Sequence, residues 1–151
     1  MTVIIDTNVL LAMLIKKGIV REIIINNPGE FITPDWCFEE AWEHRCVWNK
    51  KDLDDDDLLE ILNELKEYYV LVVPKDDYIE FENEASKLIQ DKDDIPILAL
   101  ALAIDNKGIW TFNTKDFKTE KIQTKVKIIS TKEVKKLFSN KKNNIGRSEK
   151  Q

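Results

Sequence analysis

Acidic side chains stand at the ends of two short apolar runs of the chain, where they could bind a metal ion. Asp6 comes directly after the β-branched run of residues 3–5, and Asn113 and Asp116 come just after the apolar run Ile109–Phe112. Several carboxylates gathered at one place raise one another's pKa values unless a cation neutralises them. Hard oxygen ligands suit Mg²⁺ or Mn²⁺, ions that polarise phosphoryl oxygens and lower the pKa of bound water. The chemistry that these residues indicate is phosphodiester hydrolysis.

Two further acidic groups belong to expected helices. Glu39 and Glu40 come about one helical turn after an expected strand, Phe31–Thr33. Asp91, Asp93 and Asp94 precede Ile95–Ala103, a segment that is apolar nearly all round and is therefore expected to be buried.

Each of these groups also has a purely structural interpretation. Asp6 suits a helix N-cap, as does one of the acids before residue 95. Glu39 and Glu40 could belong to a charged outer helix face, and Asn113 and Asp116 are ordinary turn residues. Each signal is weak alone, and only the joint placement of all four groups favours a site.

The elements that would position these groups alternate between strand and helix. No hairpin signal joins two strands, so the pattern predicts an α/β fold with a mainly parallel, five-stranded sheet between two helical layers. Ligands of such sheets bind at the carboxyl ends of the strands, which is where the four groups should meet. The expected strands are 2–6, 31–33, 70–73, 109–112 and 126–129; the expected helices are 8–16, 19–27, 34–49, 54–68, 76–90, 94–103 and 131–138.

The 151 residues suit one domain, and 43% of them are hydrophobic, which is enough for a core. We assign residues 1–139 to this domain and residues 140–151 to a basic, disordered tail. No apolar run is long enough to span a bilayer, and the N-terminus shows no basic leader or cleavage site. The expectation is a cytoplasmic protein that does not associate with membranes.

The net charge of −5 is unevenly spread along the chain. Residues 1–106 contain 10 Lys and Arg against 24 Asp and Glu, a balance of −14, whereas residues 107–151 contain 13 against 4, a balance of +9. One interpretation is an acidic site beside a basic surface that could bind phosphates. The other is a solvated, lysine-rich tail, which explains the same charge distribution. The lysines that could steer an RNA backbone, or serve solubility alone, are Lys115, Lys118, Lys121 and Lys125.

Other chemistries fit the sequence poorly. Cys37, Cys46 and His44 are too few and wrongly spaced for a zinc site, and two cysteines nine residues apart on a helix are poorly placed for a disulfide. One histidine leaves no Ser–His–Asp set, and no phosphate-binding glycine loop is present. A phosphoacceptor signalling domain would need a second acid after the first strand and an acid after the third. Trp36 and Trp110 could stack on bases, although core packing explains both.

The chain resembles the PIN-domain ribonucleases, which include the VapC-type toxins of prokaryotic toxin–antitoxin pairs. The resemblance covers about residues 3–138 and rests on four short motifs in the right order. They are Val3-Ile4-Ile5-Asp6-Thr7-Asn8-Val9-Leu10, Pro34 followed by Glu40, Asp94 followed by Ala99 in an alanine-rich helix, and Thr111-Phe112-Asn113-Thr114-Lys115-Asp116-Phe117.

The resemblance implies a PIN-like three-layer fold and an endoribonuclease that uses Mg²⁺ or Mn²⁺. It also implies an RNA substrate, an inhibitory antitoxin protein if the chain is a toxin, and a homodimer; a catalytically idle PIN fold that binds RNA or protein is the alternative. Glu39 could replace Glu40, and Asp93 could share or take the role of Asp94. The implied catalytic and metal ligands are Asp6, Glu40, Asp94 and Asp116, and the implied supporting residues are Thr7, Asn8, Asp93, Thr111 and Asn113.

Overall fold

The structure is a computed structural model, and it describes the backbone of residues 1–149 and the side chains of residues 1–140. Its centre is a five-stranded sheet in the order β3-β2-β1-β4-β5, in which every neighbouring pair is parallel. The predicted α/β class and the mainly parallel sheet are therefore confirmed. The strands are β1 (Val3–Ile5), β2 (Phe31–Pro34), β3 (Val70–Val73), β4 (Ile109–Trp110) and β5 (Ile128–Ile129).

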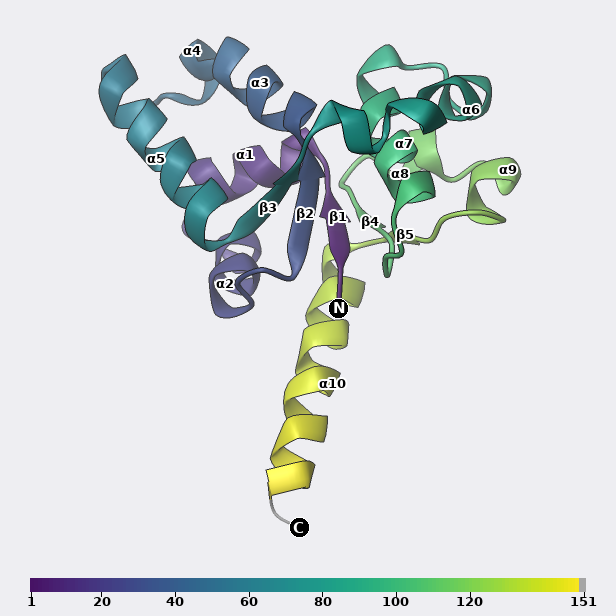
Figure 1. The fold of residues 1–151 in the computed structure, drawn as a ribbon. Helices are drawn as coiled ribbons and strands as arrows, with labels where there is room; N and C mark the ends of the chain where they lie inside the picture. The colour runs from purple at the N-terminus through teal and green to yellow at the C-terminus, as the bar shows by residue number, and fades with distance from the viewer. Residues whose placement is uncertain (150–151) are drawn as a thin grey trace.

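Helices cover both faces of this sheet, which gives the expected three layers. In Figure 1, α1 to α5 lie on one side of the sheet, α6 to α9 lie on the other, and α10 extends away from the body. The α-helices are α1 (Thr7–Ile15), α2 (Ile19–Asn26), α3 (Asp35–Glu43), α4 (Arg45–Trp48), α5 (Asp55–Tyr68), α6 (Glu82–Leu88), α7 (Ile95–Ala103), α8 (Thr114–Phe117), α9 (Glu120–Gln123) and α10 (Thr131–Glu149). Three short 3₁₀ turns are η1 (Lys75–Asp77), η2 (Ile79–Phe81) and η3 (Lys92–Asp94).

The core lies between the sheet and the helices that contact it. All three residues of β1 are fully buried, and α7 packs against β1 and β2. Five residues of α7 are buried, as its uniformly apolar sequence predicts. Because α7 is anchored in this way, its N-terminus is held at the carboxyl edge of the sheet, next to the end of β1.

Several predicted boundaries are wrong. The helix expected over 34–49 is two helices, α3 and α4, which meet at His44. The helix expected over 76–90 begins as two 3₁₀ turns, because buried Tyr78 donates a hydrogen bond to Asp35 and interrupts the helical spacing. Strands β4 and β5 are each two residues long, shorter than predicted. The helices α8 and α9 were not predicted.

The C-terminal helix α10 also differs from the expectation. It was predicted to end near Phe138 and continues through Glu149, so its backbone runs into the segment assigned to a disordered tail. Val134 and Phe138 are buried and attach its first turns to the body. Residues 150–151 and the side chains from 141 onward lie outside the described part of the chain, and the division at residue 139 stays a prediction. None of the helices described is long and apolar enough to cross a membrane.

Candidate metal centre

Asp6 lies at the end of β1 and is both an N-cap and a buried acid. Its Oδ1 accepts a hydrogen bond from the backbone N–H of Val9 (3.0 Å), which caps α1, and its Oδ2 accepts one from the Thr111 hydroxyl (2.5 Å). The residue is only 4% exposed. Burial raises the pKa of Asp6, and the hydrogen bonds from Thr111 and from the backbone of Val9 oppose that rise. Each carboxylate oxygen has two lone pairs, so capping does not prevent Asp6 from facing a cation.

Three other carboxylates meet just beyond the ends of β1 and β4. Oxygens of Asp91, Asp94 and Asp116 all lie within 4.8 Å of one another. Asp91 and Asp94 are the N-caps of η3 and α7, and Asp116 lies in α8. Asn113 holds Asp116 by a hydrogen bond from its amide nitrogen to Oδ2 (2.6 Å), while the backbone N–H of Asn113 donates to the Thr111 hydroxyl (3.1 Å).

The electrostatics of this cluster fit a bound cation. Burial, together with the negative charges of Asp91, Asp6, Asp116 and Asp93, raises the pKa of Asp94 to about 7. Asp94 Oδ2 is buried and has no hydrogen-bond partner among the described residues. A buried acceptor without a partner calls for a ligand, and a set of carboxylate oxygens is the donor set that Mg²⁺ and Mn²⁺ prefer. The residues present therefore fit the expected divalent ion.

Glu40 approaches the same site from α3. It is half-buried, and its pKa is raised by burial and by the charges of Asp93 and Asp6, while His44 and the Trp36 indole oppose the rise. Glu39 is exposed and lines a small hollow between α3 and α5 with Asp35 and Trp42. The geometry therefore favours Glu40 over Glu39 as the acid that faces the cluster.

The remaining predicted residues differ in how close they come to the cluster. Thr7 is buried and contacts the thiol of Cys37, whereas the Asn8 side chain is exposed and only its backbone N–H contacts Asp6. Asp93 is exposed and acts on Asp94 and Glu40 through its charge.

The set that the structure brings within 4.8 Å is not the set that the resemblance implied. Asp94 and Asp116 belong to it, but Asp6 and Glu40 do not. Asp6 lies close enough to Asp94 to raise its pKa, and Glu40 feels the charges of Asp6 and Asp93. Asp91 belongs to it and was not among the implied ligands. The only sequence signal for Asp91 was its place in the run of acids before α7.

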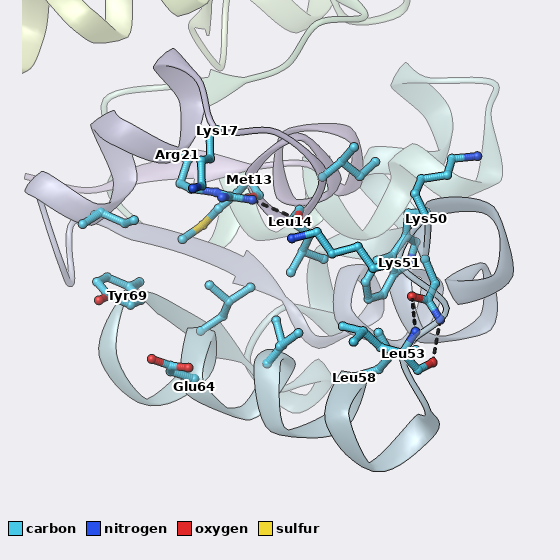
Figure 2. Close-up of a pocket in the computed structure, with 16 residues that line it drawn as sticks. Met13, Leu14, Lys17, Arg21, Lys50, Lys51, Leu53, Leu58, Glu64 and Tyr69 are labelled. Atoms are coloured by element: carbon cyan, nitrogen blue, oxygen red, sulfur yellow. Dashed lines mark hydrogen bonds between the residues drawn. The ribbon is translucent and has the colours of Figure 1, made fainter.

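A second concave feature lies away from the acids. It is a groove of about 500 Å³ between α1, α2 and α5, shown in Figure 2. Lys50 and Lys51 stand on its rim in a loop that Asn49 closes by two hydrogen bonds with the backbone of Leu53 (2.7 and 3.1 Å). The lining is mostly apolar, with Met13, Leu14, Trp48, Leu58, Leu65 and Tyr69 among its members.

Fold and acidic site together define a three-layer α/β protein with carboxylates gathered at the carboxyl edge of a parallel sheet. The family model of the PIN domain matches residues 4–138. The chain belongs to the PIN-domain family, whose members are generally nucleases.

Solved structures agree with this fold. A chain of the VapBC-1 structure from nontypeable Haemophilus influenzae superposes with a TM-score of 0.65 at 16% identity, covering 87% of this chain and 99% of that one. A chain of a toxin–antitoxin complex from Klebsiella pneumoniae gives a TM-score of 0.62 at 16% identity, covering 86% and 98%. The search of curated proteins found no match.

Proposed function

We propose that this PIN domain is an endoribonuclease that requires Mg²⁺ or Mn²⁺. The observation that carries the proposal is the Asp91–Asp94–Asp116 cluster, in which one buried Asp94 oxygen has no hydrogen-bond partner among the described residues. The charge of buried Asp6 acts on Asp94, and half-buried Glu40 lies near Asp6 and Asp93. Family membership supports the nuclease chemistry, and the acid cluster supports a divalent ion.

In this proposal the ion is held by Asp94, Asp116 and Asp91, with Asp6 and Glu40 completing the site. A bound divalent ion supplies a Lewis acid that polarises a phosphoryl oxygen and lowers the pKa of water. Thr111 and Asn113 orient Asp6 and Asp116 through the hydrogen bonds described above.

The substrate would lie along the basic surface next to Asp116. Lys115, Lys118 and Lys121 are exposed on α8 and α9 and in the turn between them, and their charge favours a phosphate backbone. Lys125 was expected to act with these three lysines. It forms an exposed ion pair with Glu84 and is therefore the weakest of the four candidates for contact with the RNA backbone.

Cleavage of RNA by the purified protein tests this function. With Mn²⁺ present, the wild-type protein should cleave single-stranded RNA, and Asp6→Asn should lower the rate at least about 100-fold, because the neutral amide removes a charge from the ion. Asparagine is also a good N-cap, so α1 should keep its start. Glu39→Gln, on the side of α3 that faces α5, is the matched control and should cleave normally. Equal cleavage by wild type and Asp6→Asn would overturn the proposal. Calorimetry with Mn²⁺ separates it from a catalytically idle PIN fold.

We further propose that the chain is the toxin of a toxin–antitoxin pair, and that the groove of Figure 2 receives the antitoxin. The groove combines an apolar floor with the basic rim of Lys17, Lys50 and Lys51. An amphipathic helix with an aliphatic face and flanking acidic residues has the complementary chemistry. Both structural neighbours come from toxin–antitoxin structures, which supports the same proposal.

The toxin proposal is tested in a bacterial host and in vitro. Expression of wild type should arrest growth, Asp6→Asn should not, and the protein encoded beside this one should relieve the arrest. Reversing two rim charges, Lys50→Glu with Lys51→Glu, should weaken that protein's binding at least about tenfold without changing RNA cleavage. Lys87→Glu, on α6, is the control. Equal binding of the neighbouring protein to both variants would move the interface elsewhere. The homodimer that the resemblance implies stays a prediction.

A further inference from the structure

Two buried polar side-chain atoms in the described part of the chain have no hydrogen-bond partner. One is Asp94 Oδ2, and the other is the indole nitrogen of Trp36. They are opposite in kind, since the carboxylate oxygen accepts and the indole N–H only donates. Buried polar atoms in folded proteins are nearly always paired, so an orphan of each kind beside one site needs an explanation.

Trp36 belongs to the side of α3 that faces the acids. It precedes Glu40 by four residues, which places the two side chains on the same helix face, one turn apart. The indole N–H is buried and has no hydrogen-bond partner among the described residues, so it is available to the Glu40 carboxylate one turn further along α3.

Other tryptophans of the chain show that an unpaired indole N–H is not the rule here. The indole nitrogen of Trp48 donates to the Ala41 carbonyl (2.7 Å), and that of Trp110 donates to the Thr131 hydroxyl (3.0 Å). Core packing therefore explains why Trp48 and Trp110 are buried, since the indole N–H of each has a hydrogen-bond partner. It does not account for Trp36, whose buried N–H has no hydrogen-bond partner among the described residues.

We propose that Trp36 is a positioning residue of the metal centre: its indole N–H donates to one oxygen of Glu40 and thereby turns the other oxygen toward the ion held with Asp94. The inference rests on the metal site of the proposed function. A carboxylate has two oxygens, so one can be fixed by the indole while the other remains a ligand. Such partners of a ligating carboxylate orient it and typically change metal affinity by about 10- to 100-fold.

Indole N–H resonances provide a readout that does not depend on catalysis. The chain has four tryptophans, so a ¹⁵N-labelled sample should give four indole signals, of which Trp36→Phe identifies one by its absence. Titration with Mg²⁺ should move the Trp36 signal along the same binding curve as the ion, whereas the Trp48 signal should stay in place because its hydrogen bond is already made. In Glu40→Ala, the Trp36 signal should no longer respond.

Calorimetry with Mn²⁺ measures the strength of the effect. Trp36→Phe keeps an aromatic ring and loses the N–H, and should weaken Mn²⁺ binding roughly tenfold. Trp42→Phe on the same helix is the matched control and should bind normally, since Trp42 stacks with Arg45 away from the acids. In a Glu40→Ala background, Trp36→Phe should have little further effect, because Trp36 acts through Glu40. Unchanged positions of the Trp48 and Trp110 signals show that each variant is folded.

The outcomes separate this inference from the function on which it rests. If wild type binds no Mn²⁺ or Mg²⁺, the proposed metal site fails. If the ion binds but the Trp36 signal stays still, or Trp36→Phe binds as tightly as wild type, only the role of Trp36 fails. Additive losses for Trp36→Phe and Glu40→Ala would likewise exclude an action through Glu40.

Discussion

Asp94 is the residue at which burial and like charge act together. Its carboxylate is half-buried, four neighbouring aspartates raise its pKa further, and one of its oxygens has no hydrogen-bond partner among the described residues. An ionised Asp94 is therefore unfavourable in the metal-free protein and favourable once a cation lies among the same oxygens. This one side chain links protonation, ion binding and folding stability.

The pH dependence of stability follows from the pKa of Asp94. That pKa rises from 3.8 to about 7 in the folded protein, so between these values the folded state binds more protons than the unfolded state. The stability of the metal-free protein should therefore fall as pH rises from about 4 to about 7 and stay low above that. Asp94→Asn removes this group and should make the fall smaller. Part of the fall in stability should remain in this variant, because the pKa values of Asp6 and Glu40 are also raised.

Thermal unfolding in a chelator at pH 5 and pH 8 measures this difference. Asp76→Asn, at an exposed acid in η1, is the control and should keep the wild-type fall. Excess Mg²⁺ should restore stability at pH 8 in wild type, by about 2.7 kcal/mol at one hundred times the dissociation constant. If the stability of Asp94→Asn fell as much between pH 5 and pH 8 as that of wild type, groups other than Asp94 would determine the pH dependence.

For single residues, the spacing of the motifs predicts which segments supply acids to the site. It predicts less well which of those acids lie together in the cluster. Asp94 and Asp116 were expected in the site and lie in the cluster. Asp91 was not expected as a ligand, because three aspartates within four residues of a turn point in directions that depend on the 3₁₀ geometry of η3. The orphan N–H of Trp36 depends on side-chain rotamers and on the packing of α3, which no spacing encodes.

The strand β4 leads into Thr111, Asn113 and Asp116 of the site, and Gly108 lets β4 and β5 approach each other. Gly108 has a φ of +140°, and a Cβ there would lie 2.7 Å from the backbone oxygen of Lys127. That same oxygen accepts the hydrogen bond from Ile109 N–H (2.8 Å), so neither backbone can move away without loss of the pairing. Thr111, which holds Asp6, follows β4 directly.

Gly108→Ala should destabilise the protein by roughly 2 kcal/mol or more, from backbone strain and from the clash with Lys127. Denaturant unfolding measures this loss. Gly18→Ser is the matched control, because the site of its Cβ is open, its backbone is extended, and serine is a good N-cap for α2. It should be neutral or slightly stabilising. A loss below about 0.5 kcal/mol for Gly108→Ala would show that β5 shifts freely.

Elements with strong periodicity were predictable, and short ones were not. The strands β1, β2 and β3 and the helices α1, α2, α5 and α7 lie close to their expected ranges because their apolar patterns are long or complete, whereas β4 and β5 lie within their expected ranges but are only two residues long. α8 and α9 have four residues each, which is too short for any periodicity. The 3₁₀ turns before α6 depend on a tertiary hydrogen bond between Tyr78 and Asp35, 43 residues apart in sequence.

Charge is unevenly distributed over the whole molecule, with an acidic site and a basic C-terminal region. The segment 140–151 contains four Lys and Arg against one Glu, and α10 carries its first part away from the body. Val134 and Phe138, which anchor α10, precede that segment. The segment should therefore add to RNA affinity through charge and add little to the stability of the core.

Truncation after Ser139 tests this division of roles, with RNA binding measured in the Asp6→Asn background to prevent cleavage. The truncated protein should unfold within about 0.5 kcal/mol of the full chain, because the buried anchors of α10 remain. Its RNA affinity should fall, and the slope of log K against log salt should become shallower by up to about 3, since each lost phosphate contact removes about 0.7 for a single strand. An unchanged slope would show that the segment does not meet the phosphates, and would leave Lys115, Lys118 and Lys121 as the basic surface that does.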